Sequence, residues 1–272
     1  MDRRVPPLYG DICGRRHAQC QKVHQVPMKP ALLPVLLGAI AGTVVAQLPA
    51  PKPIFDARLT LKPSSLTEAQ SDLVKQRIAP AARKHWQEVG RAALCIPPQE
   101  LRAIDVASGA FTRPQAEQQA ILYSYCEVGH NADLDGIAIV EGGRVVAHLV
   151  FEGAANTAIG ALPDLNGNGL AEIVIASGGT NMGTTWGALS IIEITGAEVT
   201  AFGHTGIFSD DCGERQRDCR VEAARILARP DAKPAFFRET YRRGGDAGAW
   251  KKIAAATSLT LEEDETEYEL LR

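Results

Sequence analysis

Asp164-Leu165-Asn166-Gly167-Asn168-Gly169-Leu170-Ala171-Glu172-Ile173-Val174-Ile175 joins a polar, glycine-containing loop directly to a run of β-branched residues. Asn-Gly pairs accept the positive φ angles of tight turns, whereas Val and Ile are enriched in strands. The segment therefore predicts a loop that leads into a strand. It also carries the most specific chemical signal in the chain.

The spacing of oxygen-bearing side chains in this loop suits a hard cation. Side chains with oxygen stand at loop positions one, three, five and nine, with a glycine at position six, where the backbone must turn around an ion. Calcium takes six to eight oxygen ligands, and a main-chain carbonyl at position seven supplies one of them. The sequence thus predicts a Ca²⁺ site made by Asp164, Asn166, Asn168, the carbonyl of Leu170, and Glu172.

Two features limit this prediction. Position twelve is Ile175, inside a strand, so the loop is not an EF-hand, which needs a Glu there and a following helix. Only two of the side-chain ligands are charged, so we expect weak affinity, with Kd on the order of 10⁻⁴ to 10⁻³ M. The alternative is an ordinary turn, because Asn166-Gly167 and Asn168-Gly169 are strong turn signals without any ion.

The loop resembles the calcium loops of FG-GAP and VCBS-type repeats, which build integrin-like β-propellers on the pattern D-x-[DN]-x-[DN]-G-x-x-[DE]. The resemblance covers residues 164–175 and a looser strand, Gly-rich segment, strand flank up to residue 202. It implies calcium binding at a blade strand.

A second spacing, Asn131 to Gly136, lacks the acid at position nine, where Ile139 stands, and fits either a degenerate copy or an Asx-rich turn. Without further copies, a full propeller is not predicted.

The N-terminal region has the features of an export signal. Residues 28–46 combine Lys29, an uncharged apolar run and the small-residue ending Val44-Val45-Ala46, which is typical of a cleaved signal peptide. The alternative is a retained anchor, although the run is short for a span of about 20 residues. Residues 1–27 lack periodicity, and we interpret them as a non-native or disordered extension. We expect a secreted or periplasmic protein with no membrane span after cleavage.

Charge and cysteine content support this compartment. Residues 1–46 hold six Lys/Arg and two Asp/Glu, so the remainder carries 23 basic against 30 acidic residues, and its net charge is −7 rather than −3. Nucleic acid is therefore an improbable partner, since phosphate binding needs clustered positive charge. Four cysteines remain after position 46, an even number that predicts disulfides in an exported chain. We favour Cys95–Cys126 and Cys212–Cys219 among three formal pairings.

The predicted fold class is mainly β (α+β), with antiparallel sheets of hairpins, an N-terminal helix, and a partial propeller-like or sandwich arrangement. Residues 47–272 are expected to form a single secreted domain: helical over 64–90, β-rich over 104–206 and mixed over 207–272. The local expectations are a first strand at 57–61, a Ser65–Glu68 capping box, a helix interrupted at Pro80, a hairpin over 136–151 with its turn at 141–144, a Gly/Thr-rich turn over 178–187, a helix over 220–229, a hairpin around 244–248, and an acidic turn at 262–265 before a closing strand at 268–271.

Two functions from different classes follow. The first is a non-enzymatic module in which calcium stiffens the loop and presents a surface to a protein or glycan. The second is a periplasmic or extracellular hydrolase that uses His130, His148 or His204 with nearby acids, Asp133, Asp135 or Asp210-Asp211. No G-x-S-x-G or H-E-x-x-H motif supports the hydrolase. Convergence of the three histidines on one pocket would favour the hydrolase, and scatter would favour the module.

Overall fold

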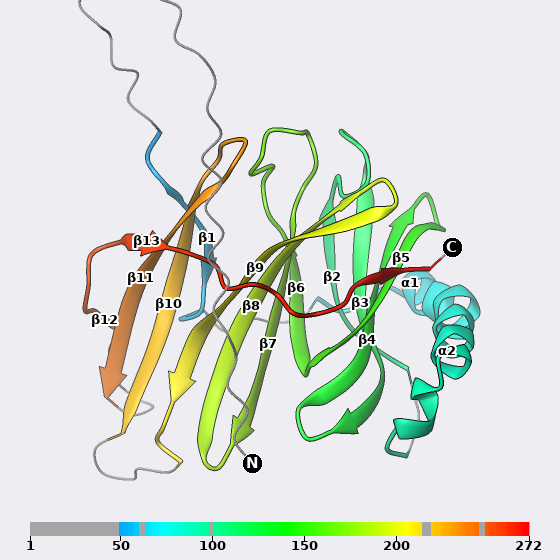
Figure 1. The fold of residues 1–272 in the computed structure, drawn as a ribbon, viewed down its shortest axis with the longest axis horizontal. Helices are drawn as coiled ribbons and strands as arrows, with labels where there is room; N and C mark the ends of the chain where they lie inside the picture. Colours follow the sequence, from blue (N-terminus) through cyan, green and yellow to red (C-terminus); the bar gives the residue numbers. More distant parts are fainter. Residues whose placement is uncertain (1–48, 60–63, 98–100, 214–218, 245–247, 272) are drawn as a thin grey trace, which may run out of the picture. The chain divides into compact units, whose positions relative to one another are not determined.

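The computed structural model describes residues 49–59, 64–97, 101–213, 219–244 and 248–271, all within one compact unit that spans residues 48–272. The predicted extension at 1–27 and the signal peptide at 28–46 lie outside the described residues. Two antiparallel sheets make up most of the described chain (Figure 1). The predicted fold class, mainly β with an N-terminal helix, is confirmed, and no closed propeller forms among the described strands.

The larger sheet has nine strands in the order β12-β11-β10-β9-β8-β7-β6, with β1 added to β10 and β13 added to β11. The smaller sheet has five strands in the order β14-β5-β4-β3-β2. The strand bounds are β1 Lys52–Asp56, β2 Arg102–Gly109, β3 Gln118–Gly129, β4 Ala132–Glu141, β5 Arg144–Ala154, β6 Asn156–Ala161, β7 Ile173–Asn181, β8 Thr184–Thr195, β9 Glu198–Asp210, β10 Arg220–Arg229, β11 Ala235–Gly244, β12 Lys251–Lys252, β13 Thr257–Leu259 and β14 Glu269–Leu270.

Alternating side chains divide the core into three layers. In β3, Leu122 faces a cluster shared with Ile173 and Ile192 of the nine-stranded sheet, whereas Tyr123 faces the helix. On the nine-stranded sheet, Val174 turns to the opposite face and joins a third cluster with Leu189. The two-residue period of a strand thus places successive residues in different layers. Both sheets bury an apolar face in the shared middle layer, which matches the sandwich part of the expectation.

The helical segment runs without a break through Pro80. It consists of α1 Glu68–Leu73, a π-turn at Val74–Ile78 and α2 Ala79–Glu88. Proline in a helix removes an N–H and clashes with the carbonyl four residues earlier. The wider π-turn, in which the amide of Ala79 donates to the carbonyl of Val74, accommodates this ring, so the expected interruption was wrong.

The helix start also differs from the expectation by two residues. Thr67 is the N-cap: its hydroxyl accepts from the amide of Gln70 at 3.3 Å, and the Gln70 side chain accepts from the amide of Thr67 at 2.7 Å. This is a capping box on Thr67 and Gln70 instead of Ser65 and Glu68. Buried residues then recur every four positions, at Val74, Ile78, Ala82 and Trp86, and pack on β3.

Three predictions in the β region were wrong in detail. Residues 220–229 form β10 instead of a helix, since pairing with β9, β1 and β11 outweighs the helix-forming composition. The Gly/Thr-rich segment 178–187 is mostly strand, with β7 and β8 paired as far as Asn181 and Thr184. The first strand is Lys52–Asp56 instead of 57–61. The hairpins over 136–151 and around 244–248 are confirmed by the β4–β5 and β11–β12 pairings.

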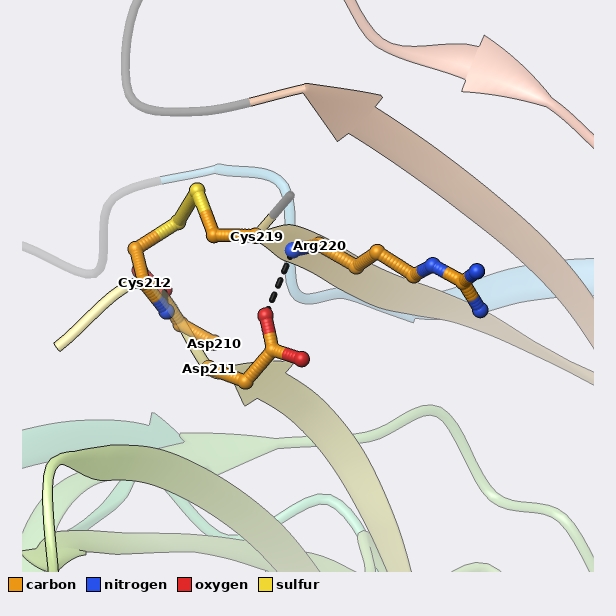
Figure 2. Close-up of a disulfide and its surroundings, with 5 residues drawn as sticks. All are labelled: Asp210, Asp211, Cys212, Cys219 and Arg220. Atoms are coloured by element: carbon orange, nitrogen blue, oxygen red, sulfur yellow. Dashed lines mark hydrogen bonds between the residues drawn. A yellow bond between two sulfur atoms is a disulfide. The ribbon is translucent and has the colours of Figure 1, made fainter. Parts of the chain in front are cut away.

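Both predicted disulfides are present. Cys95–Cys126 joins the segment after the helix to β3. Cys212–Cys219 closes the connection between β9 and β10, as Figure 2 shows. Among the described residues, no helix has the length and apolar character needed to cross a bilayer.

A segment that we call the strap, residues 260–268, runs from β13 to β14 across the nine-stranded sheet (red in Figure 1). The backbones of His204 in β9 and Glu262 exchange two hydrogen bonds of 2.9 Å, which attach the strap near its start. At the other end, Leu270 of β14 pairs with Leu149 of β5. The acidic run at 262–265 therefore precedes a closing strand, as predicted.

Candidate functional site

The predicted calcium loop connects the neighbouring antiparallel strands β6 and β7. Pairing continues from Ala161 and Ile173 into the loop, where the amide of Leu162 donates to the carbonyl of Glu172 at 2.8 Å. Three leucines of the loop, Leu162, Leu165 and Leu170, are buried. Their packing in the protein interior anchors the loop, while the Asn-Gly segment lies at the surface.

Asp164 organises the exposed tip of the loop through its carboxylate. One oxygen accepts from the amides of Gly167 at 2.6 Å and Asn168 at 3.2 Å, and the other accepts from Gly169 at 2.7 Å. Gly167 and Gly169 have φ angles of 82° and 87°, which L-residues with a Cβ rarely adopt. An Asp at position one and glycines at four and six therefore form a set of nested Asx turns.

The two asparagines turn their amide nitrogens toward Glu193 of β8. The Asn166 nitrogen lies 3.0 Å from Glu193, and the Asn168 nitrogen lies 3.0 and 2.9 Å from its two oxygens. The hydroxyl of Thr195 donates a further bond of 2.9 Å to Glu193. The asparagine oxygens accept instead from loop amides, those of Asn168 and Leu170.

Glu193 was missed by the sequence reasoning, although the sequence carries a signal for it. The residue stands within the apolar run Ile191-Ile192-Glu193-Ile194 and is only 4% exposed. An acid inside a buried strand requires compensating polar partners, because an isolated buried charge is costly. Asn166 and Asn168 of the β6–β7 loop supply those partners from the neighbouring hairpin.

Glu172 is the most deeply buried acid of the loop, with no exposed surface. Both of its oxygens accept from the amide of Leu165 at 3.0 Å. The pKa of Glu172 is raised to about 7, mainly by burial, with smaller raising contributions from the negative charges of Glu193 and Asp164 and a lowering effect of the backbone hydrogen bonds. The carboxylates of Asp164 and Glu193 therefore both act on Glu172 at this loop, and of these three acids only Glu193 was not expected here from the sequence.

The loop has side-chain oxygens that could bind a cation, but backbone amides of the same loop already donate hydrogen bonds to them. Leu170, whose carbonyl is one of the predicted ligands, donates its backbone amide to the side-chain oxygen of Asn168 at 2.9 Å, and the Leu170 side chain is buried. Among the described residues, no group of three or more His, Cys, Asp or Glu side chains is arranged to hold a metal ion. Calcium binding by Asp164, Asn166, Asn168, Leu170 and Glu172 accordingly stays a prediction, as does the FG-GAP resemblance.

The second spacing, at Asn131 to Gly136, belongs almost entirely to β4. Asn131, with φ 59°, forms the turn after β3, and Asp133 and Asp135 are buried in the strand. Burial and the charge of Glu127 raise the pKa of Asp133, while a hydrogen bond with Ser124 lowers it. A strand cannot wrap around an ion as a loop does, so the structure shows neither a degenerate calcium loop nor an extended Asx-rich turn here.

The three histidines proposed for a hydrolase lie in separate surroundings. His130 is exposed in the β3–β4 turn and donates to the carbonyl of Thr180 at 3.0 Å. His204 of β9 pairs with Glu262 of the strap at 3.4 Å. His148 is buried in β5, with its Nε2 atom 2.6 Å from the hydroxyl of Tyr123. They do not line a common cavity.

The acids at 210–211 serve the second disulfide instead of a histidine. Asp210 accepts from the amide of Cys212 at 2.9 Å, and Asp211 accepts from the amide of Arg220 (Figure 2). These bonds hold both ends of the β9–β10 connection beside the Cys212–Cys219 bridge. Their role in this geometry is structural.

Comparisons with protein-family models, with curated proteins and with solved structures found no match to this chain.

Proposed function

We propose that this chain is an exported, non-enzymatic β-rich module in which Ca²⁺ held by the loop at 164–172 stabilises the β6–β7 hairpin, and that the module presents a surface to a protein or glycan. One observation carries the calcium proposal: the carboxylates of Asp164, Glu172 and Glu193 all accept hydrogen bonds from residues 165–169 of one loop. Among the described residues, none of the three carboxylates forms an ion pair with Lys, Arg or His.

A divalent cation offsets the repulsion among these acids. A nearby positive charge favours the ionised carboxylate, whereas burial and neighbouring negative charge disfavour it. The ligands would be Asp164, Asn166, Asn168, the Leu170 carbonyl and Glu172, and Glu193 is a further candidate. Rotation of the two asparagine amides by half a turn would direct oxygen instead of nitrogen toward Glu193. The cation would supply fixed positive charge to the loop.

Export is supported by the two disulfides, because such bridges persist in oxidising compartments. The features of residues 28–46 agree with this compartment. A non-enzymatic role is supported over a hydrolase by the separation of His130, His148 and His204, each of which has a different partner. The favoured compartment is therefore secreted or periplasmic.

Thermal unfolding with and without calcium tests the proposal. An ion that binds only the folded loop stabilises it by about 1.4 kcal/mol when its concentration is ten times Kd. We expect Tm to rise at millimolar calcium, and Asp164→Ala to abolish the rise. Asp72→Ala, at an exposed helical position, is the matched control and should keep the rise. A Tm that does not respond to calcium up to about 10 mM, above the range expected for such sites, would identify an ordinary turn.

A further inference from the structure

The strap forms one wall of a cavity of about 900 Å³, which we call the strap groove. Its other walls come from the C-terminal end of β5 and from β7, β8 and β9. Figure 1 shows the strap crossing these strands on its way to β14. Ligand pockets usually measure about 300 to 1,000 Å³, so the groove can accept a short segment of chain, but it is too small for a folded domain.

Aromatic rings line the groove on both sheets. Trp186 of β8 is half-buried and contributes to the lining. Tyr268 packs on Phe151 of β5 with their ring centroids 5.1 Å apart, and its hydroxyl donates to Asp264 at 2.9 Å. The rings therefore form fixed apolar surfaces beside the acids of the strap.

Acids outnumber bases in the groove lining. Five acids line it: Glu152, Glu262, Glu263, Asp264 and Glu265. Glu152 is already paired with Arg91, which accounts for its charge, so the uncompensated charge lies on the strap. The lining contains no Lys or Arg, and its one histidine, His204, is already close to Glu262. Glu263 and Glu265 are exposed, and neither has an ion pair among the described residues.

From this combination we infer that the strap groove binds a lysine- and arginine-rich segment of a partner protein. Ammonium and guanidinium groups are attracted both to carboxylates and to the faces of Trp and Tyr rings, while their aliphatic stems pack on apolar surface. The alternative is that the acids of the strap form only a solvated turn, but such a turn does not account for the cavity or for its aromatic lining. The inference rests on the proposed binding role of the module, for which it names the partner's chemistry, and it does not depend on the calcium loop.

Isothermal titration with acetylated and amidated tetralysine tests the inference on the disulfide-bonded protein, with chelator present to exclude calcium. We expect saturable one-to-one binding at about 50 mM salt, where charges are weakly screened. Glu263→Gln with Glu265→Gln should weaken binding about three- to tenfold, as removal of two exposed ion pairs implies. The matched control, Glu117→Gln with Glu198→Gln, removes the same charge at exposed positions outside the groove and should change affinity less than twofold.

The aromatic wall provides a second test. Trp186→Ala should weaken binding about two- to fivefold, and Trp186→Phe, which keeps a ring, should weaken it less. Equal losses in the two acidic double variants would overturn the inference in favour of unspecific attraction. Tight binding of spermine with none of tetralysine would overturn the choice of a protein segment. Asp164→Ala should bind tetralysine normally, so failure of the calcium proposal and failure of this inference are distinguishable.

Discussion

The carboxylate of Asp105 in β2 accepts a hydrogen bond of 3.0 Å from the backbone amide of Ile159 in β6, and so joins the two sheets. Its other oxygen accepts from the amides of Ser64 at 2.6 Å and Val106 at 2.8 Å. Strands β2 and β6 lie side by side but belong to different sheets. One buried side chain therefore replaces part of a strand ladder at the point where the sheets meet.

Asp105→Ala should destabilise the protein by about 2 to 4 kcal/mol, because it leaves buried amide groups without their charged acceptor. Asp105→Asn keeps one acceptor oxygen and should cost less. The measurement is the free energy of unfolding in urea. Asp72→Ala, at an exposed position, should change it by no more than about 0.5 kcal/mol. A loss in Asp105→Ala as small as that of the control would show that the sheets are joined by apolar packing alone.

Gly136 of β4 lies beneath the ring of Tyr123, so a larger residue cannot fit there. A Cβ at this position would be 2.2 Å from the Tyr123 hydroxyl and 2.6 Å from the carbonyl of Leu149. Gly136→Ala should therefore cost more than about 2 kcal/mol through overpacking. Gly206→Ala is the matched control in β9, where a Cβ meets open space. Chemical denaturation of both variants checks this, and equal stability would contradict the assigned packing.

Buried His148 should make stability depend on pH below neutrality. Burial, with a smaller effect of His85, lowers the pKa of His148 to about 4, below its ordinary 6.5. The unfolded chain then binds the extra proton first, so stability is lost as pH falls from about 6.5 toward 4, by about 3 kcal/mol at most. His148→Gln should remove this part of the pH dependence, and His130→Gln, at an exposed position, should retain it. Parallel stability curves for all three proteins would refute the assignment.

The two disulfides should contribute unequally, because they close loops of different length. Their sequence separations are 31 for Cys95–Cys126 and 7 for Cys212–Cys219. Loop entropy predicts a loss of about 3.7 kcal/mol for the first and about 2.4 kcal/mol for the second. Double Cys→Ala variants of each pair, compared by urea unfolding, measure this difference. The reverse order would indicate that residual structure in the unfolded chain dominates.

Most of the β architecture could be predicted from short-range pattern. The hairpin of β4 and β5 follows from the alternation of apolar and polar residues around Gly142-Gly143. In each disulfide, a cysteine after position 46 pairs with the next cysteine along the chain. The failures share a cause. Residues 220–229 have helical composition, but strands on both sides of β10 determine their conformation. Pro80 fits a helix only because a π-turn precedes it, which no spacing rule indicates.

The loop illustrates the same limit at the candidate site. Positions one to nine could be identified from a linear pattern, and the structure places Asp164 at the centre of the turn, where its carboxylate accepts from three loop amides. Glu193 comes from the strand after the next turn, so its approach to Asn166 and Asn168 depends on the register between β7 and β8. A two-residue turn at Met182-Gly183 fixes this register, and the expectation of a longer turn over 178–187 missed it.

The strap also has a consequence for how the protein folds. Leu270 pairs with Leu149, and Tyr268 packs on Phe151, so the edge of the five-stranded sheet closes only with residues far along the chain. A ribosome must complete the chain through residue 270 before this edge can be covered. Such long-range pairing slows folding, and an open strand edge is prone to aggregate in the meantime. Intermediates that lack the strap are therefore the stage at which a chaperone would be most useful to this protein.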